Sequence, residues 1–231
     1  MGMLNRKVAD YQPTTHNRYV PACTYIVDGD VCRVSLGTPV VADADGLLAV
    51  VDTTATTGSI TVTGNALLGA IGATADAPYG RNVTVTGAGA GAKVLTIVGK
   101  DYLGQSMKET ITCVAGDGTG VKAFKSVSSI TLGAVAGDAT TNFGWGDVLG
   151  LPFKTVKILS EEANGVLEAT LGALVGPVMT NPQTATTGDP RGTYNPQTVL
   201  AVTTEIVVTC VFDASVVSGN GGYHGIRHYN G

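Results

Sequence analysis

The sequence predicts a mainly β protein, built as an antiparallel β-sandwich of jelly-roll type with an extended N-terminal arm and long loops. Three observations support this prediction. Glycine supplies 32 of the 231 residues, charged residues make up only 14%, and apolar residues alternate with threonine along short runs between the glycines. β-Branched residues fit a pleated sheet, while glycine permits the tight turns that join its strands. The hydrophobic share of 44% is sufficient for a folded core.

Residues 1–21 form the predicted N-terminal arm. They are polar and interrupted by Pro13, and they show neither a helical nor a strand period. Two interpretations remain open: a frayed terminus, or an arm that becomes ordered against a neighbouring subunit. The second would use basic and aromatic side chains, namely Arg6, Lys7, Tyr11, Arg18 and Tyr19.

Residues 22–231 form the predicted β-rich domain, which begins with a hairpin. Two short apolar runs, Cys23–Val27 and Val31–Leu36, flank an Asp-Gly-Asp turn. Such a hairpin would allow Cys23 and Cys32 to face each other. The N-terminus shows no signal-peptide pattern, so we expect synthesis in a reducing cytoplasm and buried, reduced cysteines.

Residues 80–132 form the predicted central module of the sandwich. Val83 and Val85 alternate with threonines, and Leu95 and Ile97 repeat the pattern one run later. Period-2 alternation between glycines indicates half-buried antiparallel strands.

A glycine-rich run, Gly87–Lys93, is similar in composition to a phosphate-binding loop. It lacks the required Gly-Lys-Ser/Thr ending, and a strand-like segment follows it in place of a helix. We therefore expect a flexible hairpin tip.

Three features that follow the central module can be interpreted from the sequence. The only tryptophan, Trp145, would pack in the core or lie at a subunit contact. The adjacent carboxylates Glu161 and Glu162 have no nearby nucleophile, which favours a solvated loop over an acid–base pair. The proline-rich loop 177–198 should form a long surface excursion.

The clearest single strand is predicted over residues 199–212, where apolar residues occupy one face. At about 3.3 Å per residue it would extend roughly 40 Å and cross the whole sandwich. The last segment, 220–231, is predicted as a polar edge strand or an interface. Its His224 and His228 would lie roughly 13 Å apart on a strand, too far to share a metal ion.

Composition and motifs argue against several classes of function. A net charge of −4 with scattered Lys and Arg argues against a nucleic-acid partner. No apolar run reaches the 18 residues that a transmembrane helix needs. Because no catalytic, cofactor-binding or metal-binding motif is recognisable, we predict that the protein is not an enzyme and requires no cofactor.

Four segments carry a family resemblance. The module opens with RNVTVTG, continues with VGKDYLGQSMKETIT and closes with KAFKSVSSIT, and a later segment reads DPRGTYNP. Together these segments resemble a recurrent module in structural proteins of tailed bacteriophages, often found in capsid decoration (cement) proteins. The segments are Arg81–Gly87, Val98–Thr112, Lys122–Thr131 and Asp189–Pro196.

The resemblance implies a virion component. The leading hypothesis is a decoration protein on the capsid exterior, made in the host bacterial cytoplasm. Its expected partners are the major capsid protein and further copies of itself, as a trimer or, failing that, a dimer. A tail-tube or tail-tip subunit, or another virion structural subunit such as a major coat component, is the alternative. A carbohydrate-binding β protein is a third interpretation, which the 6% aromatic content disfavours. The expected interface residues are Arg6, Lys7, Tyr11, Arg18, Tyr19, Trp145, Arg191 and Tyr194.

Overall fold

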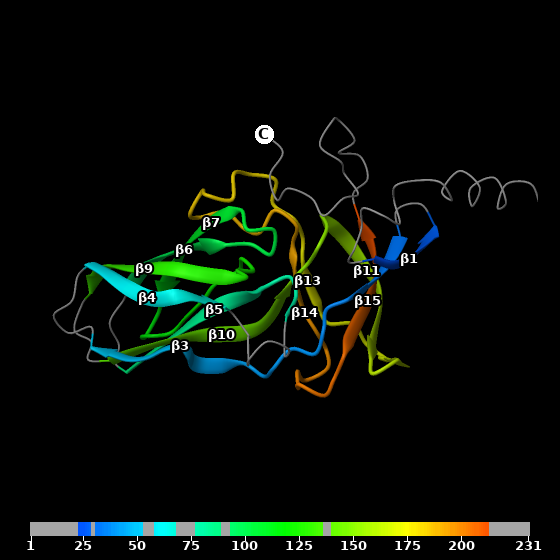
Figure 1. Cartoon of the computed structure of the whole chain (residues 1–231), viewed down its shortest axis with the longest axis horizontal. Helices are drawn as coiled ribbons and strands as arrows, with labels where there is room; N and C mark the ends of the chain where they lie inside the picture. The colour runs from blue at the N-terminus through cyan, green and yellow to red at the C-terminus, as the bar shows by residue number, and fades with distance from the viewer. Residues whose placement is uncertain are drawn as a thin grey trace, which may run out of the picture.

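The computed structural model describes residues 23–28, 31–52, 58–67, 77–88, 93–135 and 140–212. These residues form fifteen strands and no helix, and all strand pairs are antiparallel, so the mainly β, antiparallel part of the prediction is confirmed. The predicted N-terminal arm and the C-terminal edge segment lie outside the described residues. The strands belong to three sheets (Figure 1).

The first sheet, here called the terminal sheet, joins strands from both ends of the chain. Its strand order is β1-β2-β15-β11-β12. The strands are β1 (Cys23–Asp28), β2 (Val31–Ser35), β15 (Ile206–Phe212), β11 (Thr155–Ala163) and β12 (Val166–Leu167).

The predicted hairpin of β1 and β2 is confirmed, but its register separates the two cysteines. Cys23 lies opposite Val34, and Cys32 lies opposite Ile26. On its other side Cys32 lies directly opposite Cys210 of β15. The thiols of Cys32 and Cys210 are therefore neighbours, in place of those of Cys23 and Cys32.

The central sheet contributes to both apolar cores of the molecule. Its order is β13-β14-β10-β5-β8, and β3 pairs with the first half of β10. The strands are β3 (Asp43–Asp52), β5 (Arg81–Ala88), β8 (Gly118–Thr119), β10 (Thr140–Gly150), β13 (Ala173–Val175) and β14 (Thr193–Asn195).

The four-stranded sheet has the order β4-β9-β6-β7. Its strands are β4 (Gly58–Leu67), β9 (Ser126–Val135), β6 (Lys93–Lys100) and β7 (Ser106–Cys113). In Figure 1 this sheet and the terminal sheet lie toward opposite ends of the molecule, with β13 and β14 between them.

The expected hairpin tip at Gly87–Lys93 is wrong. The strands β5 and β6 that flank it do not pair, because they belong to different sheets. The Lys93 side chain is fully buried, and its Nζ donates a hydrogen bond to Thr141 Oγ1 at 2.6 Å. The connection therefore crosses between sheets and ends on a buried lysine.

Two apolar cores follow from the predicted alternation. Val83, Val85, Leu95 and Ile97 are all buried, as expected, in a core shared by the central and four-stranded sheets. The second core lies beside the terminal sheet, where Val34, Ile158 and Cys210 meet Leu149 of β10 and Tyr194 of β14.

The long strand predicted over 199–212 is wrong in length but correct in position. Strand β15 begins only at Ile206, because Thr204 N donates to Ala201 O and turns the chain before it. Val202, which the apolar pattern assigned to the buried face, is exposed, whereas Leu200 on the same face is buried. The strand is internal to its sheet, between β2 and β11.

The segment 177–198 is only partly the surface excursion that was predicted. Residues 182 and 185 accept hydrogen bonds along the otherwise free edge of β7, from Lys108 N at 3.1 Å and Thr110 N at 2.6 Å. The chain then enters the interior over 189–194, where all six residues are buried. It passes the four-stranded sheet and adds β14 to the central sheet, so it fastens the two sheets together.

Charged side chains anchor this segment in the interior. Arg191 Nη2 donates to Asp101 Oδ2 at 2.6 Å, and its guanidinium lies 4.7 Å above the Tyr102 ring. Asp189 accepts hydrogen bonds from the backbone amides of Ala123 and Arg191. Buried charges are tolerated when they are paired or hydrogen-bonded in this way.

A second buried cluster lies next to it. Lys122 Nζ donates to the carbonyl oxygens of Lys108, Pro182 and Thr184 at 2.8–2.9 Å. The Glu109 carboxylate accepts hydrogen bonds from the amides of Val121 and Lys122. Burial nevertheless raises the pKa of Glu109 from 4.5 to about 7, and burial also raises the pKa of Asp189.

Arg81, the first residue of the module, is also buried. Its guanidinium donates to the carbonyl oxygens of Gly146 at 2.8 Å and Val40 at 2.6 Å, and contacts Asp147 at 3.3 Å. Burial lowers the pKa of this guanidinium to about 10. The arginine thus joins β5 to β10 and to the segment that precedes β3.

The raised pKa of Glu109 predicts a pH-dependent stability. Because the folded state binds this proton more tightly than the unfolded chain, the contribution is complete below pH 4.5 and is lost as the pH rises through 7. At 1.36 kcal/mol per pKa unit, the loss amounts to at most about 3 kcal/mol. Urea unfolding between pH 5 and pH 8 should show this decline, and Glu109→Gln should make its slope smaller. Asp189, whose pKa burial also raises, contributes with the same sign to the slope that remains.

The partly exposed Glu162 supplies the control for that measurement. Glu162→Gln should leave the slope of unfolding free energy between pH 5 and pH 8 unchanged, because the hydrogen bond from Arg33 lowers the pKa of Glu162 from 4.5 and so keeps its titration below this range. A slope that is equally steep in the wild type and in Glu109→Gln would contradict the role given to Glu109.

Candidate interaction surface

Large apolar side chains are exposed along one part of the chain. Nine of the fourteen such side chains among the described residues lie between residues 156 and 202. We call them the apolar strip: Val156, Leu159, Val166, Leu167, Leu171, Val175, Met179, Val199 and Val202. Single exposed apolar residues are ordinary, so it is their concentration in this stretch of the chain that makes it the candidate interaction surface.

The tip of the apolar strip is the β11–β12 hairpin. Asn164 and Gly165 form its two-residue turn, with φ angles of 50° and 76°. Positive φ at both positions is the signature of a type I′ turn, for which Asn-Gly is the preferred sequence. The turn projects Val166 and Leu167, each 67% exposed, away from the body of the protein.

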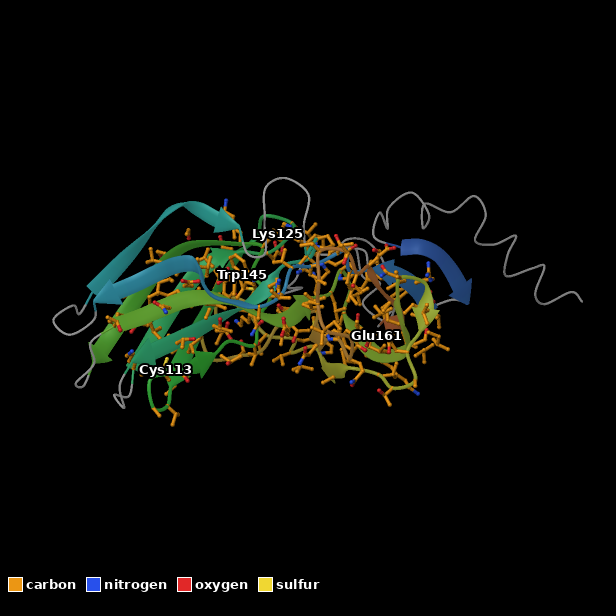
Figure 2. All side chains as sticks on the ribbon, turned by 90° about the horizontal axis from the view of Figure 1, so that it is seen from below. Cys113, Lys125, Trp145 and Glu161 are labelled. Carbon is orange, nitrogen blue, oxygen red and sulfur yellow. The ribbon has the colours of Figure 1, made fainter. Side chains whose placement is uncertain are left out.

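A buried carboxylate, that of Glu161 on β11, holds the surrounding loops in place. It accepts hydrogen bonds from Tyr194 Oη at 2.5 Å, Gly172 N at 3.1 Å, Gln197 N at 3.0 Å and Thr198 N at 3.2 Å. Burial, and then the hydrogen bond to Glu161, raise the pKa of Tyr194. Figure 2 shows Glu161 within the ribbon of the part of the molecule that contains the terminal sheet.

The loops that Glu161 binds carry two members of the apolar strip. Gly172 follows Leu171, and Thr198 precedes Val199. A further link joins the segments, since Thr198 Oγ1 donates to Glu168 Oε1 at 2.8 Å. The backbone next to Leu171 and Val199 is therefore held in one arrangement by the interior.

The predicted loop at Glu161 and Glu162 is wrong. Both residues belong to β11, where neighbouring positions point to opposite faces of the sheet. Glu161 is buried, and Glu162 forms a partly exposed ion pair with Arg33 at 2.6 Å, which lowers the pKa of Glu162.

Three of the expected interface residues lie in the interior. Arg191 and Tyr194 bond to carboxylates of the same chain, and both are buried. Trp145 is also buried in the core that the central and four-stranded sheets share. The other five, Arg6, Lys7, Tyr11, Arg18 and Tyr19, lie outside the described residues.

The apolar strip was not predicted from the sequence, although a signal was present. Residues 169–188 contain no charged side chain, in a run of 20 positions. Their prolines and glycines indicated a loop, and the absence of charge on an expected loop was the sign of a contact surface.

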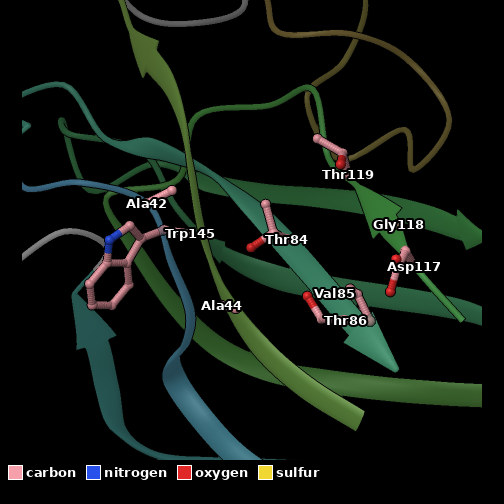
Figure 3. Close-up of a pocket in the computed structure, with 9 residues that line it drawn as sticks. All are labelled: Ala42, Ala44, Thr84, Val85, Thr86, Asp117, Gly118, Thr119 and Trp145. Carbon is pink, nitrogen blue, oxygen red and sulfur yellow. The ribbon is translucent and has the colours of Figure 1, made fainter. Parts of the chain in front are cut away.

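A hollow of about 360 Å³ lies beside strands β3, β5, β8 and β10 of the central sheet (Figure 3). It is lined by Ala42, Ala44, Thr84, Val85, Thr86, Asp117, Gly118, Thr119 and Trp145. Asp117 is its only ionisable residue, and the amide of Gly87 donates to that carboxylate. The indole of Trp145 packs on Gly46 and donates to Val41 O, so its face is not presented as a stacking platform.

In the described ranges, no group of three or more His, Cys, Asp or Glu side chains is placed to hold a metal ion. Those same ranges contain no helix with the length and apolar character that a membrane crossing requires. Comparisons with protein-family models, curated proteins and solved structures found no match to the chain.

The role of Glu161 predicts that substitution of two adjacent glutamates will change the free energy of unfolding by very different amounts. Glu161→Gln should lower the free energy of unfolding by about 2–4 kcal/mol, because the new amide group would face N–H donors and lose the charge that binds them. Denaturant unfolding at neutral pH measures the change.

The matched control is Glu162→Gln on the same strand. Its partly exposed ion pair with Arg33 should contribute less than about 1 kcal/mol. Equal losses in the two variants would show that the buried carboxylate does not organise the loops.

Proposed function

We propose that the chain is a structural protein of a tailed-bacteriophage virion. In this proposal it is a decoration protein, which binds the outside of the assembled head and bridges neighbouring coat subunits. The observation that carries the proposal is the apolar strip. Part of it lies on loops that hydrogen bonds to Glu161 hold in place. These loops adjoin Asp189–Pro196, a segment that resembles one found in phage structural proteins. The proposed fold is accordingly an antiparallel sandwich, in which the central and four-stranded sheets enclose the shared core.

An apolar strip of this kind gains free energy when a partner covers it. Burial of apolar surface contributes about 25 cal/mol per Å². Because Glu161 and its hydrogen bonds already hold the loops in place, binding would cost little further ordering of the backbone. A surface with these properties suits a protein whose action is adhesion.

The absence of charge over residues 169–188 suggests the character of the partner surface. Without ionic groups, attachment through this region would depend weakly on salt concentration. We therefore propose an apolar or uncharged patch on the major capsid protein as the site of attachment.

Multiple contacts would account for stabilisation of a shell. A protein that touches two coat subunits converts the second contact into an intramolecular step, so that individually weak contacts sum to firm attachment. Self-association as a trimer is part of the proposal, with a dimer as the next choice, because closed symmetry would present several strips at once.

The proposal predicts that two substitutions at the hairpin tip will weaken attachment. In Val166→Asp/Leu167→Asp, charged groups would have to be desolvated at the contact, and affinity for heads should fall by about 10-fold to 100-fold. Cosedimentation of the purified protein with heads from the encoding phage, first stripped of this chain, measures the affinity.

The control is Val114→Asp. Val114 is 76% exposed but lies outside the apolar strip, so attachment should persist at the wild-type level. Unchanged binding by the double variant would show that the apolar strip is not part of the contact surface. Particles that carry the chain in the tail would favour a tail subunit, and particles that lack it, together with binding to a glycan array, would favour a carbohydrate-binding protein.

A further inference from the structure

Two cysteine thiols lie next to each other where strand β2, near the start of the described chain, pairs with strand β15 at its end. Cys32 on β2 and Cys210 on β15 are register partners in an antiparallel pair. Both side chains are fully buried on the core side of the sheet, and their Sγ atoms lie 3.8 Å apart. The contact joins residues that are 178 positions apart in the sequence.

The backbone at this position suits a covalent bond. Directly opposed residues of an antiparallel ladder have Cα atoms about 4.5–5.5 Å apart. Disulfides occur with Cα separations of about 4.4–6.8 Å, so the strands need not move apart or together. The remaining change is rotation of the side chains, which brings the sulfur atoms from contact to bonding distance.

We propose that Cys32 and Cys210 form a reversible disulfide when the protein moves from reducing to oxidising surroundings. A low-molecular-weight disulfide, such as oxidised glutathione, is the oxidant. The thiolate of one cysteine attacks a glutathione sulfur and releases one glutathione; the thiolate of the second attacks the mixed disulfide and releases another. The protein loses two hydrogen atoms, and one glutathione disulfide is reduced to two thiols.

The other cysteines are poorly placed to compete. Cys113 is buried in the core of the central and four-stranded sheets, and Figure 2 shows it far from Glu161 and the strands of the terminal sheet. Cys23 lies opposite Val34, two register positions away from Cys32 along β2. Among the described cysteines, only Cys32 and Cys210 are direct register partners whose side chains lie on the same face of one sheet.

The bond would have a specific mechanical consequence. It would close a loop that contains nearly all of the described chain, including the whole central and four-stranded sheets. Cross-linking residues this far apart restricts the unfolded chain strongly. Strands β2 and β15 could then separate only after the disulfide is reduced. This inference does not depend on what the apolar strip binds.

The test is refolding of the full chain in glutathione buffers of defined redox ratio. Refolding gives both thiols access to the oxidant before they become buried. Alkylation of remaining thiols, digestion and mass spectrometry then identify the linked peptides. We expect the Cys32–Cys210 peptide pair to accumulate as the buffer becomes more oxidising, and the oxidised protein to melt on the order of 5–10 °C higher than the reduced protein.

Single-cysteine variants complete the design. Cys210→Ala and Cys32→Ala should each abolish the melting shift between reduced and oxidised samples, whereas Cys113→Ala should retain it. Since each variant is compared with itself in the two buffers, any cost of the substitution to stability cancels. A Cys23–Cys32 linkage, glutathione adducts alone, or thiols that stay reduced throughout would overturn the proposal.

Discussion

Buried carboxylates that bind backbone amides are the constraint on which the rest of this structure depends. Glu161 collects hydrogen bonds from Gly172, Tyr194, Gln197 and Thr198, and Asp189 does the same for Ala123 and Arg191. Each carboxylate joins segments that no strand pairing connects. A buried anion is costly unless its oxygens are fully occupied, and these loops supply the donors that satisfy it. The loops and the carboxylates therefore stabilise one another.

The four segments on which the proposed phage relationship rests contribute several charged residues to this interior. Arg81, Asp101, Glu109, Lys122 and Arg191 all come from them, and all are buried in the chain. Their hydrogen-bond partners include backbone carbonyls, backbone amides and each other, and Arg81 also contacts Asp147. These segments thus supply the polar side chains that connect the loops to the interior. The proposed contact surface lies on other residues, those of the apolar strip.

The sequence was informative wherever neighbouring residues decide the structure. Alternation at Val83, Val85, Leu95 and Ile97 predicted strands and their buried faces correctly, because the two-residue period is a local property. The β1–β2 hairpin followed from its turn residues in the same way. The sequence misled where distant partners decide. Asp101 and Arg191 are 90 positions apart in the sequence. Likewise, no residue next to Glu161 in the sequence indicates the four groups that donate hydrogen bonds to its buried carboxylate.

The wrong prediction over 199–212 concerns part of the apolar strip. Val202 continues the two-residue apolar period of β15, and apolar residues in register with a strand are normally assigned to its core face. The loop that contains Val199 and Val202 is bound at Thr198 by Glu161 and turns at Ala201, so both residues lie outside the strand and are exposed. Exposed apolar side chains order the surrounding water at a free-energy cost, which burial against a partner surface would remove. That cost is the physical basis of the binding role proposed for the strip.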